Sequence, residues 1–335
     1  MNPTPWPDAV ADVVERAVTT EYASLTRAGT PVTVPTTPYL GERADTIDVS
    51  TGLTYPAKAE RARTDPRVAL LLADPVGAPG TPAVLVQGLA TVRDSDLQAN
   101  TDRYVRVSTA KLPDATKGQP KMVLRRMAWY YARIWVEVTP LHIWWWPSRE
   151  LEAAPSEWHA PDGTSAPLSD PPPPGRRPGA WLSPPAAWEP LARSMAAQGA
   201  LVDVTAVGAN EFPVCLPAHA TAVSSDGIHL RLGPGALALS DGPACLTMHL
   251  HDERFTGQEN HSFVGTLTSL DTGLLFRVER VLPDWSLAGN KARVAVGFLA
   301  KGRILQRRLA AEAARRGQPV PKVRFPARAS SSAAS

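Results

Sequence analysis

DVSTGLTYPAKAERARTDPRVALLL, residues 48–72, decides the fold of the N-terminal half of this chain. DVST ends a run in which apolar and polar residues alternate, as they do in a half-buried strand, and Gly52 then breaks the run. Pro56 opens a short helix, AKAERARTD, because proline suits the first turn of a helix. Pro66 ends this helix, and RVALLLAD predicts a buried strand. The stretch therefore predicts a strand, a turn, a short helix and a second strand.

Hydroxyl groups and cationic side chains crowd around this turn and the first turns of the helix. Hydroxyls, free amides at a helix N-terminus and an ammonium group that converge on one point are what a phosphate monoester requires. The alternative interpretation is an ordinary helix with solvated lysine and arginine side chains. The groups concerned belong to Ser50, Thr51, Thr54, Lys58, Arg61 and Arg63.

Toward the N-terminus, the pattern predicts a helix followed by a hairpin. Apolar residues follow helical spacing across residues 6–23. Two short runs rich in β-branched residues then flank Arg27–Thr30, where Gly29 supplies the positive φ that a tight turn requires. We therefore expect two antiparallel strands joined at this glycine.

Toward the C-terminus, strands enclose a helical region. AVLVQGLATVRD, residues 83–94, predicts a strand in which Gly88 marks a bulge or a close approach. Helical sequence follows over residues 97–131, and ARIWVEVTPLHIWWW, residues 132–146, predicts the closing strand. About six strands with little helix are typical of a small antiparallel barrel.

The same pattern recurs in the second half of the chain. TPVTVP is echoed by FPVCLP, residues 212–217, and the spacing of the proline and glycine at positions 66 and 88 recurs at positions 243 and 265. These echoes, in the same order, indicate a duplication. Between the copies, a segment rich in Pro, Ser, Ala and Gly predicts a linker partly in polyproline II, with its tryptophans packed on a domain surface. The predicted domains are a split barrel with the cofactor site (1–146), the linker (147–188), a second, degenerate barrel (189–300) and a basic helix with a disordered tail (301–335).

The second copy differs from the first at the segment that would hold a phosphate. GPGALALSD, residues 233–241, contains no lysine or arginine. Beyond this copy, KGRILQRRLAAEAARR, residues 301–316, predicts a basic amphipathic helix. Such a helix contacts nucleic acid in some proteins, but it is more often a solvated face, and no recognition motif accompanies it here. We therefore expect an anion site in the first copy alone and no nucleic-acid partner.

The run from Glu21 to Val92 resembles the pyridoxamine 5'-phosphate oxidase-like, FMN-binding split-barrel superfamily. Its members typically show a glycine-containing hairpin, a proline-bounded strand, a strand that ends in Ser-Thr, a lysine, and then Asp-Pro-Arg-Val. This chain has Glu60-Arg61 where many relatives have Arg-Asn. The resemblance covers the first copy to about residue 147, and it implies a mainly β fold of two tandem split β-barrels with peripheral helices. The matching residues are Pro31, Pro35, Ser50, Thr51, Lys58, Arg61, Asp65, Pro66, Arg67 and Val68.

The resemblance also implies roles for individual residues. Lys58 and the Ser50-Thr51 backbone would hold the cofactor phosphate, and the Thr33–Pro35 strand would lie beside the isoalloxazine ring. Relatives complete this pocket across a dimer interface, so we expect either a monomer with an internal pseudo-dimer or a homodimer. From its position just before the strand glycine, Gln87 presents an amide suited to a flavin carbonyl. The predicted cofactor-binding residues are Thr33, Val34, Pro35, Ser50, Thr51, Thr54, Lys58, Arg61 and Gln87.

Two further groups leave alternatives open. His249 and His251 flank Leu250 on a predicted strand, so both rings share one face, where they would bind a metal or haem or form a solvated strand end. Aromatic residues cluster between Trp129 and Trp146. They would stack on a planar cofactor, or they belong to the barrel core and the domain interface.

The bulk composition excludes several classes of protein. The formal net charge is +3, which argues for no polyanionic partner, and no apolar run is long enough to span a membrane. The N-terminal residues lack the features of a signal peptide. Cys215 and Cys245, the two cysteines, do not make a disulfide framework, so we expect reduced thiols and a cytoplasmic location.

These observations together predict an oxidoreductase that uses FMN or a deazaflavin coenzyme on a small organic substrate. Hydride transfer would belong to the cofactor ring, so no catalytic side chain is assigned. One alternative is a non-catalytic flavin- or haem-binding protein that serves as a sensor, carrier or store. The other is a structural pair of barrels that has lost the pocket in both copies.

Overall fold

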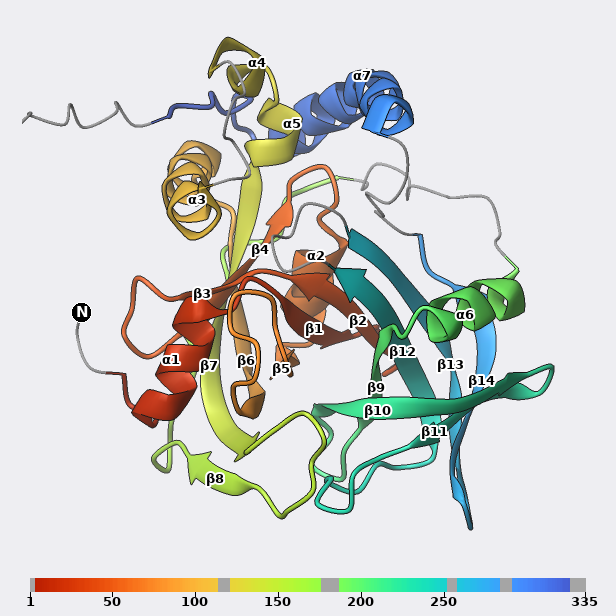
Figure 1. Ribbon diagram of the computed structural model, residues 1–335. Helices are drawn as coiled ribbons and strands as arrows, with labels where there is room; N and C mark the ends of the chain where they lie inside the picture. Colours follow the sequence, from red (N-terminus) through yellow and green to blue (C-terminus); the bar gives the residue numbers. More distant parts are fainter. Residues whose placement is uncertain (1–3, 114–120, 176–186, 252–257, 284–290, 326–335) are drawn as a thin grey trace, which may run out of the picture.

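The structure is a computed structural model that describes residues 4–113, 121–175, 187–251, 258–283 and 291–325 (Figure 1). The strands of the first sheet are β1 (Thr20–Leu25), β2 (Pro31–Thr36), β3 (Pro38–Leu40), β4 (Ile47–Gly52), β5 (Arg67–Leu72), β6 (Ala83–Arg93), β7 (Arg133–Trp146) and β8 (Ser156–His159). They pair in the order β2-β1-β5-β6-β7-β4-β3, with β8 added to β7. The sheet curls so that its two ends meet. The hydroxyl of Thr36 in β2 donates to the carbonyl oxygen of Ser50 in β4 at 3.2 Å.

Two glycines shape this sheet as the sequence predicts. The β1–β2 hairpin closes with a hydrogen bond from the amide of Thr26 to the carbonyl oxygen of Thr30, and Gly29 has a φ of 77°. In β6 the register shifts at Gly88, where a Cβ atom would lie 2.5 Å from the carbonyl oxygen of Thr139. Gly88 is therefore both a bulge and a close approach of two backbones.

The second sheet closes into a six-stranded barrel in the order β10-β11-β14-β13-β12-β9. Its strands are β9 (Leu201–Val207), β10 (Pro213–Ser224), β11 (Gly227–Arg231), β12 (Gly242–His251), β13 (Gln258–Leu270) and β14 (Gly273–Val281). Across the first sheet, β2-β1-β5-β6-β7-β4 follow one another, and β10-β9-β12-β13-β14-β11 do so across the second. The strands correspond one to one in chain order, so the fold is two split β-barrels in tandem.

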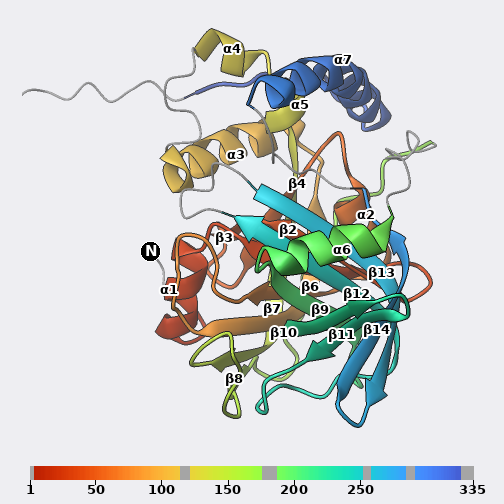
Figure 2. The same cartoon turned by 45° about the vertical axis from the view of Figure 1, so that its right-hand side comes forward.

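Helices surround the two barrels. They are α1 (Asp8–Arg16), α2 (Ala57–Thr64), α3 (Leu97–Lys111), α4 (Lys121–Arg125), α5 (Ala128–Tyr131), α6 (Trp188–Ala197) and α7 (Lys291–Arg315). Figures 1 and 2 both show α3, α4, α5 and α7 gathered at one end of the first sheet. Among the described residues, no helix combines the length and the apolar character that crossing a membrane requires.

The helix predicted over residues 6–23 is too long. The observed helix ends at Arg16, Ala17 has extended backbone, and β1 begins at Thr20. Because β1 pairs with β2 on one side and β5 on the other, two ladders of backbone hydrogen bonds hold this segment as a strand. These tertiary contacts override the helical spacing of its side chains.

The Pro-rich segment does not behave as a linker over its described part, residues 147–175. β8 pairs with β7, and Trp158 of β8 packs on the core of the first barrel, edge-on to Trp6. Further along, the carbonyl oxygen of Pro167 accepts a hydrogen bond from Thr91, and the Asp170 carboxylate accepts two from backbone amides that follow β6. The segment therefore lies along the first barrel, with Trp158 packed against it as expected, while Trp181 lies outside the described residues.

The basic helix predicted over residues 301–316 is the C-terminal part of α7, which begins at Lys291. It buries Leu305, Leu309 and Ala313 against the core of the first barrel. The chain thus returns, after completing the second barrel, to cover the first.

A separate apolar cluster joins the two barrels. It combines residues of β1, β5, β6 and β7 with Val214, Cys215 and Leu216 of β10. Beside this cluster, Arg67 of the first barrel pairs with exposed Glu211 of the second at 2.6 Å. The interface between the barrels is therefore a packed core with a polar rim.

Candidate functional site

The turn between β4 and α2 forms the corner that the sequence identifies. β4 ends at Gly52, the amide of Tyr55 donates to the carbonyl oxygen of Gly52 at 2.8 Å, and Pro56 precedes the first turn of α2. The hydroxyl of Thr51 donates to the carbonyl oxygen of Tyr55 at 2.8 Å and so holds the turn closed. No side chain caps the N-terminus of α2. Its first amides therefore remain available to an anion.

Lys58 lies in the first turn of α2, with a half-buried side chain. Burial, together with the neighbouring guanidinium groups of Arg133 and Arg61, lowers the pKa of Lys58 to about 7, against a smaller opposing effect of Glu21. Lys58 forms no hydrogen bond or ion pair with any residue that the structure describes. An ammonium group beside two guanidinium groups is a site that attracts an anion.

Arg133, which sequence analysis did not identify, comes from the start of β7. Its guanidinium group donates to the hydroxyl of Tyr104 at 2.9 Å and lies over the ring of that tyrosine. A Cβ atom at Gly52 would lie 2.9 Å from Nη1 of Arg133, so the glycine leaves room for this cation beside the turn. The only local signal in the sequence is an arginine at a strand end, which carries no functional meaning by itself.

Two further arginines reach the same corner. Arg61 donates from Nε to the hydroxyl of Ser24 in β1 at 2.9 Å. Arg308 of α7 donates from Nε to the carbonyl oxygen of Thr54 at 3.2 Å, and its guanidinium group lies 5.5 Å from the ring centre of Tyr55. Side chains from α2, β7 and α7 thus place positive charge around one strand-to-helix turn. We call this group, Lys58 with Arg61, Arg133 and Arg308, the cationic corner.

The residues expected beside the flavin ring divide into two sets. Val34 and Pro35 of β2 are half-buried, and Val34 packs against the core of the first barrel. Thr33 is buried against the second barrel: its amide donates to Sγ of Cys245 at 3.3 Å, and its hydroxyl lies 2.7 Å from that of Thr205. Thr33 thus belongs to the contact between the barrels and Val34 to the core of the first barrel, while Pro35 keeps a partly exposed side chain.

Gln87 also contacts the second barrel. Its Nε2 donates to the carbonyl oxygen of Pro213 at 3.0 Å, and its Oε1 accepts from Asn210 at 2.8 Å. Both ends of the buried amide are used, so a hydrogen bond from Gln87 to a flavin carbonyl would require these contacts to break. In this structure Gln87 connects the two barrels.

The corresponding corner of the second barrel is filled. Residues 232–241 pack against the chain that follows β7, where the amide of Gly235 donates to the carbonyl oxygen of Leu151 at 2.8 Å. The indole of Trp146 donates to the carbonyl oxygen of Gly235 at 2.9 Å. A Cβ atom at Gly233 would lie 1.9 Å from the carbonyl oxygen of Glu150. Backbone therefore occupies the space in which the first barrel has its cations.

Most of the aromatic cluster is buried, in the core of the first barrel, in the cluster between the barrels and in a further cluster with α3. Trp135 and Trp146 are fully buried, and Trp129 and Tyr131 are nearly so. Tyr130 is the exposed member, 5.0 Å from the guanidinium group of Arg133. The cluster thus supports the walls of the barrel, and Tyr130 alone of these five lies at the cationic corner with an exposed ring.

The two barrels bring together a buried group of ionisable side chains. Glu21 of β1 and Asp203 of β9 occupy equivalent positions, each opposite the second proline of the neighbouring strand. His249 lies 3.0 Å from Asp203, and Arg149 lies 3.3 Å from the same carboxylate. His249 is therefore held in an ion pair inside the protein, and the solvated strand end expected for it is wrong. His251 is half-buried beside it.

Burial raises the pKa of Glu21 to about 7, against the opposing effect of His249. A carboxyl group with a higher pKa in the folded protein stabilises the fold while it is protonated. For Glu21 this contribution is complete below its unfolded pKa of about 4.5, and it is lost as the pH rises through 7. Glu21→Gln mimics the protonated form. We expect it to raise the free energy of unfolding by about 2 kcal/mol above pH 8 and by nothing at pH 4. Urea unfolding from pH 4 to pH 9 measures this difference.

Glu152→Gln is the matched control for Glu21, because Glu152 is exposed. Its free energy of unfolding should follow that of the original protein at every pH. A gain from Glu21→Gln that is the same at pH 4 and pH 9 would contradict the assignment of a raised pKa to Glu21.

A hollow of about 450 Å³ lies away from the cationic corner, between α3, β6 and β7. Arginine and carboxylate side chains line it, and they pair with one another, as Arg93 does with Glu137 at 3.0 Å and Arg106 with Glu42 at 2.8 Å. Because these charges neutralise each other, the hollow offers no unpaired group for a phosphate.

The fold and the site define a class: a tandem split-barrel protein with one cationic strand-to-helix corner, in its first barrel. No family model and no curated protein matches the chain. Solved structures that match in fold carry the names of the superfamily that the sequence resembles. A putative pyridoxamine 5'-phosphate oxidase of Listeria innocua is 18% identical, with a TM-score of 0.30, and the match covers 42% of this chain and 98% of that one.

Two further matches have similar measures. A pyridoxamine 5'-phosphate oxidase-related, FMN-binding protein of Nostoc punctiforme is 15% identical over 43% of this chain and 84% of its own, with a TM-score of 0.32. A protein titled F420 reductase is 15% identical over 39% of this chain and 93% of its own, with a TM-score of 0.30. At such identities and TM-scores these likenesses do not carry a function to this chain.

Proposed function

We propose that the first barrel binds a flavin-type cofactor, FMN or a deazaflavin, by its phosphate at the cationic corner, and that the protein is an oxidoreductase for a small organic substrate. One observation carries this proposal. Lys58 is a half-buried ammonium group beside Arg61 and Arg133, and no described residue pairs with it. Such a concentration of positive charge is costly unless an anion binds there.

The residues at the corner fit a phosphate group. Lys58 and Arg133 would supply charge, and the first amides of α2 would donate hydrogen bonds along the helix axis. Gly52 keeps the turn free of a side chain that would displace Arg133. Thr51 holds the turn through its bond to Tyr55 and so contributes shape rather than a free hydroxyl.

The ring would lie along the end of β2 that meets β4, where Thr36 reaches the carbonyl oxygen of Ser50. The half-buried side chain of Pro35 would offer it apolar contact there. A bound flavin or deazaflavin supplies the hydride-transfer chemistry, while the protein positions the ring and limits its contact with water. No described side chain is assigned as a catalytic acid or base.

A second candidate function is a non-catalytic flavin-binding protein. The observation that favours it concerns Thr33 and Gln87, the polar residues expected beside the ring. Both form hydrogen bonds with the second barrel instead. A ring held mainly by apolar contact would be stored or carried with little tuning of its reactivity. Haem has less support, because His249 is buried in its pair with Asp203.

Ligand titration tests the phosphate assignment directly. The purified chain is titrated with FMN, a deazaflavin coenzyme and riboflavin, which has the ring of FMN without its phosphate. We expect FMN to bind about 10–150-fold more tightly than riboflavin, the ratio that corresponds to a charge-assisted hydrogen bond of about 1.5–3 kcal/mol.

Equal affinities for FMN and riboflavin would refute the phosphate site, and so would the absence of binding by FMN and the deazaflavin at millimolar concentration. Turnover of the cofactor-loaded protein with reduced nicotinamide or with reduced deazaflavin then separates the two candidate functions. Oxidation of the reductant supports the oxidoreductase. A bound cofactor that is never reduced supports the carrier.

A further inference from the structure

The pairing of β7 with β8 brings three potential metal ligands together on the surface of the first barrel. The register places His142 opposite His159 and Trp144 opposite Glu157. Side chains alternate along a strand, so His142 shares a face with Trp144, and Glu157 shares that face with His159. Trp158 points the other way and anchors β8 on the core. Strand pairing therefore holds two imidazoles and a carboxylate at one place.

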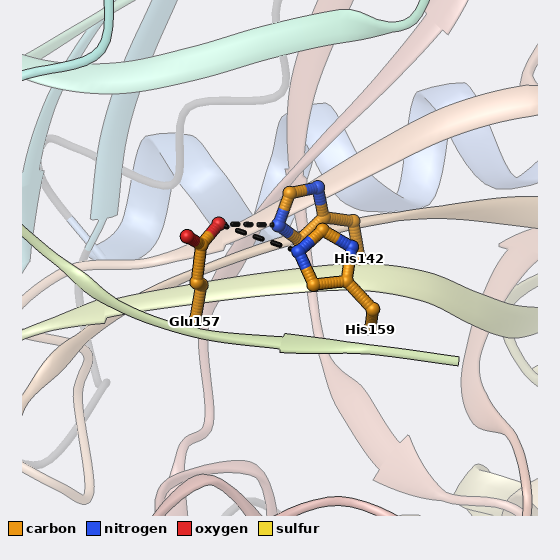
Figure 3. A group of neighbouring side chains, drawn as sticks. All are labelled: His142, Glu157 and His159. Carbon is orange, nitrogen blue, oxygen red and sulfur yellow. Dashed lines mark hydrogen bonds and ion pairs between the residues drawn. The ribbon is translucent and has the colours of Figure 1, made fainter. Parts of the chain in front are cut away.

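The geometry of this group is that of a ligand set. Nε2 of His142 lies 3.0 Å from Oε2 of Glu157, and Nε2 of His159 lies 3.4 Å from the same oxygen. Figure 3 shows both ring nitrogens directed at the carboxylate. In a tetrahedral zinc site, ligands about 2.0–2.2 Å from the metal lie about 3.3 Å from one another. The observed separations match the edges of such a tetrahedron.

The burial of the three side chains suits a metal ion that keeps one coordination position open to solvent. The ring of His142 is mostly buried and stacks against Trp144 with 3.4 Å between ring centres, which fixes its orientation. Glu157 and His159 are exposed, so solvent reaches the side of the group away from β7.

We propose that His142, Glu157 and His159 form a surface site for a divalent transition-metal ion, with Zn²⁺ the best fit. Two imidazoles and one carboxylate provide nitrogen and oxygen ligands of the kind zinc takes, and water completes the shell. The ion would fasten β8 to β7 at the end of the first sheet opposite α7 (Figure 1). This site is independent of the proposed cofactor site.

A second group, Glu21, Asp203 and His249, also brings its ligand atoms within 4.8 Å of one another. It differs in its charge environment. Arg149 already pairs with Asp203 at 3.3 Å, and the charge of Lys58 lowers the pKa of Glu21. A metal cation there would be repelled by these two positive groups. Among the described residues, the ion-pair partners of Glu157 are the two imidazoles alone. The charge balance therefore favours the surface group.

The test is a titration of the untagged full chain with Zn²⁺ by calorimetry, and with Co²⁺ by visible absorption. We expect one ion per chain with a micromolar dissociation constant, and a cobalt spectrum of low-symmetry, four- or five-coordinate type. His159→Ala and Glu157→Gln each remove one ligand at an exposed position. Each variant should weaken zinc binding by at least about 10–100-fold. Mutation of residues that only support a ligand already has an effect of this size, so loss of a ligand should have at least as large an effect.

His219→Ala is the matched control, because His219 is exposed and lies 2.7 Å from Glu150 in a pair that lacks a second imidazole. Its zinc affinity should equal that of the original protein. Unchanged affinity in both His159→Ala and Glu157→Gln would overturn the proposal, as would binding of the original protein only at millimolar zinc. Loss of binding in the His219 variant as well would place the ion elsewhere and also overturn it.

Discussion

Replacing Lys58 with alanine is expected to weaken FMN binding by about 1.5–3 kcal/mol, or about 10–150-fold in the dissociation constant. Lys58 forms no hydrogen bond or ion pair with a described residue, and the charge of Glu21 acts on it only weakly, so its loss removes a contact to the phosphate without breaking an internal pair. Arg61 and Arg133 remain, and for this reason some binding should persist. Fluorescence or absorption titration with FMN at pH 7 measures the change.

Two variants separate charge from packing. Lys58→Met keeps most of the side-chain length and should lose as much affinity as the alanine variant, whereas Lys322→Ala, at an exposed position, should lose none. The original protein should also bind FMN less tightly as the pH rises above about 7, because Lys58 with its lowered pKa must then take up a proton to pair with the phosphate. Equal dissociation constants for the Lys58 variants and the original protein would remove the basis of the proposed function.

Arg316→Ala is expected to lower the free energy of unfolding by about 3 kcal/mol, the lower end of the range for removing one partner of a buried ion pair. Arg316 follows α7, and its side chain is 2% exposed. It pairs with Asp94 at 2.9 Å, with Glu312 at 2.5 Å and with Glu60 of α2 at 3.4 Å. Its removal leaves buried carboxylates with less compensation, which is costly where water cannot reach them.

The loss stays at the lower end of the range because neighbouring arginines remain. Arg63 still pairs with Asp94, and Arg315 still pairs with Glu60. The control is Arg106→Ala, whose guanidinium group is exposed and pairs with exposed Glu42, so about 1 kcal/mol or less is expected. Urea unfolding of the three proteins at pH 7 gives the comparison. Similar losses in the two variants would show that the Arg316 network does not hold α7 in place.

Much of the fold could be predicted because its signals are local. The hairpin at Gly29, the bulge at Gly88, the helix that carries Lys58 and the long closing strand each follow from a short stretch of sequence. The echo of TPVTVP in FPVCLP predicted a second copy, and the second sheet has the strand order of the first. The helix predicted over residues 6–23 was wrong in its second half, since spacing alone does not reveal that two neighbouring strands pair with β1.

The candidate site divides in the same way. Lys58, Thr51 and Gly52 lie within one strand-turn-helix segment, whose backbone geometry their own residue types determine. Arg133 and Arg308 come from β7 and α7, and an isolated arginine on a strand or helix has no pattern that reports its neighbours. Gln87 and Thr33 show the reverse case, because contact with the second barrel uses polar groups that the sequence left available to a ligand.

By itself the sequence determined where most strands of the first copy lie along the chain, that a second copy follows, the turn glycines and the position of the lysine, since each depends on a short stretch of residues. The tertiary structure alone decided what surrounds that lysine, which barrel face stays open, and that His142 meets Glu157 and His159. Such contacts join strands, helices and barrels that are far apart in sequence. Their partners are selected by packing and charge balance over the whole molecule, and no local residue pattern records that selection.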